Sequence, residues 1–85
     1  MSGRTGLRRA RVLLALTSEG QSVYKIAKAT GLKYNAVENI LDALSRTNLA
    51  HPAPAQRGWC LSIGVYVEAA LAEARALVEA QGVEG

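Results

Sequence analysis

The sequence predicts a mainly helical domain with one small β-hairpin, in the order helix, helix, helix, hairpin, helix. Apolar residues recur at helical spacing in several segments, and one short stretch near Trp59 alternates apolar and small or polar residues between turn-forming prolines and glycines. The chain has 85 residues, a length that suits one compact domain. Hydrophobic residues make up 49% of it and charged residues 20%, a balance typical of globular rather than disordered proteins.

The first three helices are predicted from apolar periodicity and from their end signals. The first helix covers residues 7–17, with the apolar positions Leu7, Ala10, Leu13, Leu14 and Leu16. Residues 1–6 lack this periodicity, so we expect a flexible basic arm there. Ser22 is the expected N-cap of a short second helix over residues 23–29. The third helix, over residues 34–46, has the apolar stripe Val37, Ile40, Leu41 and Leu44.

The hairpin and the last helix follow. Pro52 and Pro54 are incompatible with a helix interior but are tolerated on an edge strand. Trp59, Leu61 and Ile63 alternate with Cys60 and Ser62, which predicts a half-buried returning strand, with residues 55–58 as the loop. Beyond Gly64 we expect a helix over residues 65–81 and a disordered tail over residues 82–85.

Residues 23–44 have the spacing of a helix-turn-helix. Ala27 is small where two steeply crossing helices must approach closely. Gly31, four residues later, suits a tight turn that needs a positive φ. Leu32 is expected to pack beneath that turn as an apolar residue, and Val37 and Ile40 are expected to pack the next helix against the core. The pattern predicts a helix pair whose second helix exposes a polar face.

This polar face has the chemistry that reads DNA bases in a major groove. It consists of Lys33, Tyr34, Asn35, Glu38, Asn39 and Asp42. Asparagine matches adenine, glutamate accepts from a cytosine amino group, and lysine or tyrosine bonds a phosphate or a base edge. We therefore expect base contacts from Lys33, Tyr34, Asn35, Glu38 and Asn39. The alternative interpretation of Glu38 and Asp42 is that they lie on a solvated face and that DNA phosphates repel their carboxylates.

Positive charge is concentrated in the first two thirds of the chain. Residues 1–57 carry nine Lys or Arg against three Asp or Glu, whereas residues 58–85 carry one against four. We expect contacts to the DNA backbone from Arg4, Arg8, Arg9, Ser22, Lys25, Lys28 and Arg46. For the N-terminal arginines, ordinary surface solubility is the alternative.

From Leu7 to Gly64 the chain resembles the winged helix-turn-helix domains of IclR- and MarR-type bacterial regulators, above all in IAKATGLKYNAVENILDALSRTNLA and RGWCLSIG. The resemblance covers about two thirds of the chain and implies a winged helix-turn-helix domain over residues 7–64. It also implies that the hairpin lies over the flanking backbone or minor groove, with Gln56 and Arg57 at its tip. The ligand-binding domain of IclR-type proteins has no counterpart in these residues, so no small-molecule ligand is expected.

Catalysis and metal binding have no support in the sequence. It shows neither a Ser, His and Asp set nor a Gly-rich loop after a strand, and Cys60 with His51 falls short of a zinc ligand set. We expect no enzyme activity, no cofactor and no metal. With no leader-like or membrane-length apolar run, we expect a cytoplasmic, nucleoid-associated protein.

The last predicted helix has an apolar stripe of Val67, Leu71, Ala74 and Val78, which would pack on the first helix, on a second copy, or on both. We expect a homodimer through this stripe, with two recognition helices about one DNA turn apart on an inverted repeat. The expected function is a sequence-specific double-stranded DNA-binding regulator, most simply a repressor that acts by occupancy. One alternative is an architectural or segregation protein on repeated DNA sites. Another is a protein-contact module without DNA binding, which the basic front of the chain disfavours.

Overall fold

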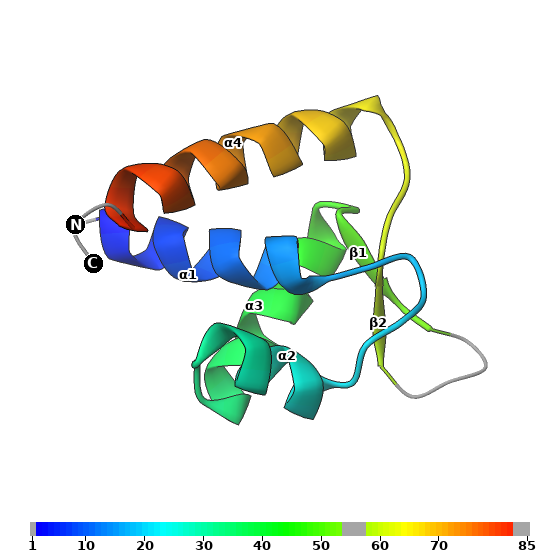
Figure 1. Cartoon of the computed structure of the whole chain (residues 1–85). Coiled ribbons are helices and arrows are strands. Elements are labelled where there is room, and N and C mark those ends of the chain that lie inside the picture. The colour runs from blue at the N-terminus through cyan, green and yellow to red at the C-terminus, as the bar shows by residue number, and fades with distance from the viewer. Residues whose placement is uncertain (1, 54–57, 83–85) are drawn as a thin grey trace.

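The computed structural model describes the backbone of residues 2–53 and 58–82, and the side chains of residues 6–53 and 58–80. Within these residues the elements are α1 (Ser2–Ala15), α2 (Val23–Thr30), α3 (Tyr34–Arg46), β1 (Ala50–Pro52), β2 (Trp59–Leu61) and α4 (Val65–Gly82). Figure 1 shows α4 lying along α1, with α2 and α3 on the other side of α1 and the hairpin at one end. The predicted mainly helical fold with one antiparallel β-hairpin is confirmed.

Both ends of the described chain are more helical than the sequence predicts. Helix α1 begins at Ser2, so the flexible arm expected over residues 1–6 is wrong for residues 2–6. A Cβ atom at Gly6 would lie 3.5 Å from Leu77 Cδ2 of α4, which shows how closely this part of α1 approaches α4. Close approach to α4 at Gly6 therefore accompanies the helical state of this segment. Gly82 belongs to α4, and residues 83–85 of the expected tail lie outside the described part of the chain.

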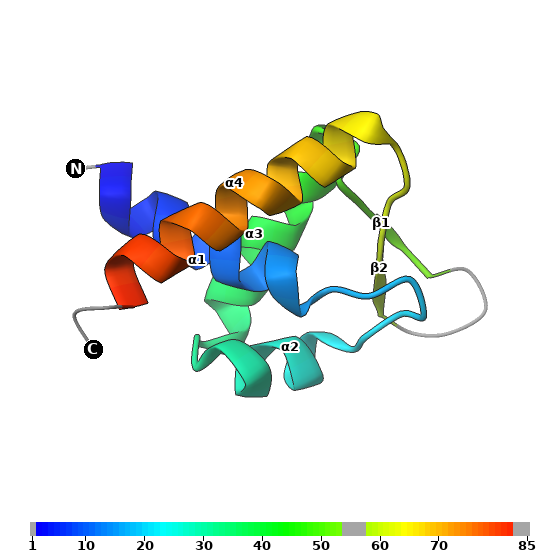
Figure 2. The same cartoon turned by 45° about the horizontal axis from the view of Figure 1, so that its top comes forward.

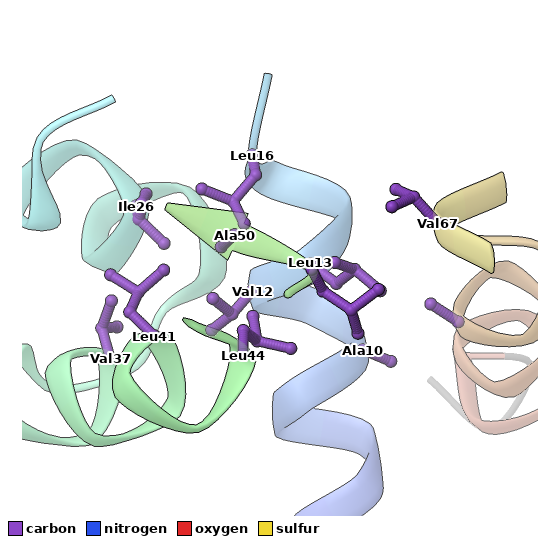
Figure 3. Packing of buried hydrophobic residues seen from close by; sticks show 12 residues of the cluster. Ala10, Val12, Leu13, Leu16, Ile26, Val37, Leu41, Leu44, Ala50 and Val67 are labelled. Atoms are coloured by element: carbon purple, nitrogen blue, oxygen red, sulfur yellow. The ribbon is translucent and has the colours of Figure 1, made fainter. Parts of the chain in front are cut away.

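Helix α1 lies at the centre of the core and packs on two sides. Val12, which is fully buried, faces Leu41 and Leu44 of α3, whereas Leu13 faces Val67 of α4 (Figure 3). The buried cluster consists of Ala10, Val12, Leu13, Leu16, Ile26, Val37, Leu41, Leu44, Leu49, Ala50, Val67 and Ala74. The helix therefore joins two layers, and Figure 2 shows α4 crossing over α1 on the side away from α2.

Helix α3 ends in a Schellman-type turn that leads into the hairpin. Asn48 has a positive φ of 62°, the conformation that asparagine tolerates better than most residues. The amide of Leu49 donates to the Leu44 carbonyl at 2.9 Å, and the amide of Asn48 donates to the Ser45 carbonyl at 3.1 Å. The Tyr66 hydroxyl donates to the Asn48 carbonyl at 2.8 Å, which ties the start of α4 to this turn.

The hairpin is held against the loop between α1 and α2. Strands β1 and β2 pair antiparallel, and Trp59 also bridges to Gln21, with backbone hydrogen bonds of 2.8 Å in both directions. Gly58 permits this approach, because a Cβ atom there would lie 2.4 Å from the Gln21 carbonyl oxygen. The position of the hairpin relative to the helices is therefore fixed by β-type pairing on both edges of β2.

The predicted inward face of the returning strand is partly wrong. Strand β2 ends at Leu61, and Ile63 is 89% exposed rather than buried. Cys60 is the buried residue of the strand, facing Gly20 of the preceding loop, where a Cβ atom would lie 3.5 Å from the Cys60 sulfur. Trp59 and Leu61 pack half-buried against the core, as predicted for this side of the strand, whereas Ile63 lies beyond the end of β2.

Candidate nucleic-acid interface

The turn between α2 and α3 is closed by a small network of hydrogen bonds. Gly31 has φ 77°, and its amide donates to the Ala27 carbonyl at 2.8 Å, so the predicted positive φ is confirmed. The Thr30 hydroxyl donates to the Ile26 carbonyl at 2.8 Å and accepts from the Leu32 amide at 3.3 Å. These bonds satisfy backbone groups at the end of α2 and set the direction in which α3 leaves the turn.

Helix α3 has one buried and one exposed face. Val37, Leu41 and Leu44 have no exposed surface, and Ile40 is half-buried against the same cluster. The opposite face presents Lys33, Tyr34, Asn35, Glu38, Asn39 and Asp42, all of them exposed. The residues predicted for base contacts are thus gathered on one accessible side of a 13-residue helix.

The N-terminal end of α3 combines a lysine with backbone amides that no side chain caps. Lys33 occupies the N-cap position, and its side chain makes no capping hydrogen bond, since an ammonium group cannot accept one. The first amide groups of α3 are therefore not covered by a capping side chain, and the helix dipole adds partial positive charge there. Together with the Lys33 ammonium group, this end of the helix suits a phosphate oxygen.

One of the two carboxylates on the exposed face is paired. The Arg46 guanidinium lies 2.9 Å from the Asp42 carboxylate, at the i,i+4 spacing along α3. Both side chains are mostly exposed, so the pair contributes at most about 1 kcal/mol to folding. It compensates the charge of Asp42, and it commits Arg46, predicted as a backbone contact, to a partner within its own helix.

Helix α2 brings two lysines and a tyrosine to the surface beside α3. The Ser22 hydroxyl accepts from the Lys25 amide at 3.1 Å, so the predicted N-cap is confirmed. Lys25 and Lys28 are exposed, and the Lys28 ammonium lies 5.5 Å from the centre of the Tyr24 ring. Tyr24, 62% exposed, was not among the predicted site residues. The Tyr-to-Lys spacing of four residues is the sequence signal that would have pointed to it.

The arginines of α1 do not gather on the exposed face of α3. Arg9 lines a groove between α1 and α4, together with Glu73. Arg11 lies beside Ala29 and Thr30 at the end of α2, and Arg8 is exposed. The Arg4 side chain lies outside the described residues, as do Gln56 and Arg57 of the hairpin loop. The residues predicted to contact the DNA backbone are thus divided among α1, the N-cap and surface of α2, and the end of α3.

The stripe predicted for dimerisation is used within the chain. Val67 is 2% exposed and Ala74 is 5% exposed, and Leu71 and Val78 pack half-buried against the same core. Packing within the chain, one of the outcomes expected for this stripe, is thus observed, and a homodimer through the stripe stays a prediction.

Other chemical sites are sparse in the described part of the chain. Across residues 2–53 and 58–82, no group of three or more His, Cys, Asp or Glu side chains is arranged to hold a metal ion. None of the helices in the same ranges combines the length and the apolar character that crossing a bilayer demands. His51 Nδ1 lies 3.2 Å from the Ser62 hydroxyl across the hairpin, on the exposed side.

No protein-family model matches the chain, and no curated protein matches it either. The resemblance to IclR- and MarR-type domains stays a prediction from the sequence. The function is therefore inferred from the geometry of α2, α3 and the hairpin.

Proposed function

We propose that this protein is a winged helix-turn-helix transcriptional regulator that binds double-stranded DNA in a sequence-specific way and represses by occupying its site. The observation that carries the proposal is the division of α3: Val37, Leu41 and Leu44 are buried and Ile40 is half-buried, whereas the polar side chains of the opposite face are exposed. A polar helix face of this kind, next to a tight turn and a lysine-bearing helix, is what a major groove accepts. The proposal involves no catalytic step and no cofactor.

In this proposal Asn35 and Asn39 read base edges. They lie one helical turn apart on the exposed face, so their amide groups are separated by about 6 Å along the helix. Stacked base pairs are about 3.4 Å apart, so the two side chains would reach bases one or two steps apart. Each amide donates and accepts in the pattern that adenine offers in the major groove, and Glu38, between them, would select a cytosine amino group.

Helix α2 and the hairpin would hold the protein in register on the DNA backbone. Lys25 and Lys28 are exposed beside α3, and the Tyr24 ring restricts the Lys28 side chain by a cation–π contact. The hairpin is attached to the α1–α2 loop through Trp59 and Gln21, so it would meet the flanking groove in a defined position. Phosphate contacts of this type position a protein, while the α3 side chains would supply sequence preference.

The test is selection of bound sequences from random duplexes by the purified protein, followed by a salt titration of the enriched site. We expect one enriched motif whose affinity falls steeply as salt rises, because phosphate contacts release counterions. The proposal fails if no sequence is enriched and duplex binding is negligible at low salt, and the protein-contact alternative would then be favoured. Enrichment of clustered direct repeats without promoter repression would favour the architectural or segregation role.

A further inference from the structure

The outer side of α2 holds one lysine against an aromatic ring. Tyr24 and Lys28 are four residues apart, so their side chains are neighbours on the same side of the helix. The Lys28 Nζ atom lies 5.5 Å from the centre of the Tyr24 ring, within the range at which a ring face attracts an ammonium group. Ile26, two residues from each, is buried on the opposite side of the helix, and both members of the pair are exposed. In Figure 1 and Figure 2, α2 lies on the side of α1 away from α4.

No carboxylate among the described side chains competes with the ring for Lys28. Helix α2 contains no acidic residue, and the ion pair of the described chain joins Asp42 to Arg46 within α3. Glu19, in the loop before α2, and Glu38, on α3, are exposed and form no ion pair with Lys28. The contact with the Tyr24 ring is therefore the interaction that orients the Lys28 side chain.

Lys25 differs from Lys28 in this respect. It lies on the same helix, has the same charge and is also exposed, but the cation–π contact is made by Lys28. A free lysine loses much of its rotamer freedom when it binds a ligand, whereas a lysine that a ring already holds has lost part of it beforehand. The ring covers one side of the ammonium group and leaves N–H donors for an oxygen acceptor.

We infer that Tyr24 is a positioning residue for the DNA backbone: its ring holds the Lys28 ammonium in place for a phosphate of the duplex that α3 reads. Two lysines without an acidic neighbour on α2 complement a phosphate chain, and phosphate contacts fix the register of a protein on DNA. Tyr24 acts through Lys28, while Lys25 contacts phosphate without such help. This inference rests on the proposed function and adds to it a residue that the sequence pattern did not select.

The test is a double-mutant cycle in which fluorescence anisotropy measures binding to a duplex of mixed, unselected sequence at low salt. Tyr24→Leu should weaken binding about two- to fivefold, the effect of losing an exposed cation–π contact. The same change should have no effect in a Lys28→Ala background and its full effect in a Lys25→Ala background, which is the matched control. Tyr24→Phe keeps the ring and should recover most of the affinity that Tyr24→Leu loses.

A salt titration separates positioning from direct contact. Lys28→Ala should lower the dependence of log affinity on log salt concentration by about 1, because one phosphate contact is lost. Tyr24→Leu should leave this slope unchanged, since Lys28 still reaches the phosphate from a less ordered state. Circular dichroism and thermal unfolding confirm that each variant is folded as the wild type is.

The outcomes distinguish this inference from the function on which it rests. A wild-type chain that binds duplex while Tyr24→Leu is equally weakening in the Lys28→Ala and Lys25→Ala backgrounds overturns the positioning role alone. A Tyr24→Phe variant as weak as Tyr24→Leu would show that the hydroxyl, rather than the ring, is required, and it also overturns that role. A wild-type chain without duplex binding at low salt overturns the proposed function and this inference with it.

Discussion

Two glycines with positive φ play different parts in this protein. Gly31, with φ 77°, has no atom within 4 Å of the place where a Cβ atom would be. Gly58, with φ 143°, has the Gln21 carbonyl oxygen only 2.4 Å from that place. The first glycine is needed for its conformation alone, whereas the second is also needed because the backbone of the α1–α2 loop lies against it.

These surroundings predict different costs of substitution. Gly31→Ala should lower the free energy of unfolding by about 1 kcal/mol, the typical cost of placing alanine at a left-handed conformation. Gly58→Ala should cost about 3 kcal/mol or more, because the Cβ clash adds to the backbone strain and separates Trp59 from Gln21. Urea denaturation of both variants checks the order. Equal costs would mean that the hairpin is not held in place at Gly58.

On the exposed polar face of α3, Asn39→Ala should reduce the discrimination between bases at one position of the DNA site by about 1–3 kcal/mol while leaving the protein folded. The reason is that Asn39 is exposed and takes no part in the core. Lys25→Ala is the matched comparison: it should weaken all sequences alike and reduce the salt slope by about 1. Binding isotherms on the selected site and on single-base variants, at several salt concentrations, separate the two effects. If Asn39→Ala weakens every sequence equally, this residue does not read a base.

At the scale of elements, the orientation of α3 depends on how the short helix α2 begins and ends. Eight residues make a helix too short to be stable alone, so its caps and its packing decide whether it forms. Ser22 caps its first turn, and Thr30 with Gly31 closes its last. The buried Ile26 attaches it to the core between these two ends.

Loss of the N-terminal cap is the direct test of this dependence. Ser22→Ala should destabilise the protein by about 1 kcal/mol, since the Lys25 amide loses its acceptor. Ser18→Ala, at an exposed serine in the preceding loop, is the matched control and should change stability by less than about 0.5 kcal/mol. Thermal unfolding of both variants gives the comparison. A Ser22→Ala variant as stable as the control would show that packing alone positions α2.

At the scale of the whole molecule, α1 is the element on which both layers depend. It contacts α2 and α3 on one side and packs along much of α4 on the other. Leu13, 3% exposed, faces α4 within this arrangement. Shortening the Leu13 side chain would leave a cavity between α1 and α4, and α1 is the helix that joins the two layers.

Leu13→Ala should therefore lower the free energy of unfolding by about 2–5 kcal/mol, a large fraction of the stability of a domain of this size. Ile63→Ala is a suitable contrast, since it also shortens an aliphatic side chain, but one that is 89% exposed, and it should be nearly neutral. Chemical denaturation with a fixed m-value for both variants tests the difference. A small effect of Leu13→Ala would mean that α4 is only loosely attached to α1.

Features that depend on neighbours along the chain are predicted correctly from the amino-acid pattern. The helix over residues 34–46, the cap at Ser22 and the positive φ at Gly31 follow from periodicity and turn chemistry, which act over a few residues. The exposed polar side of α3 follows in the same way, because an apolar stripe that is buried leaves the opposite side outward.

The partner that covers each apolar surface is known only from contacts between distant parts of the chain. Periodicity identified the stripe through Val67 and Ala74, but contact with α1, rather than a second copy, buries it. Gly6, in the helical first turns of α1, lies close to Leu77 of α4, and Ile63 is exposed because β2 ends at Leu61. These outcomes depend on contacts between residues far apart in the chain, and a one-dimensional pattern specifies that a face is buried without specifying what buries it.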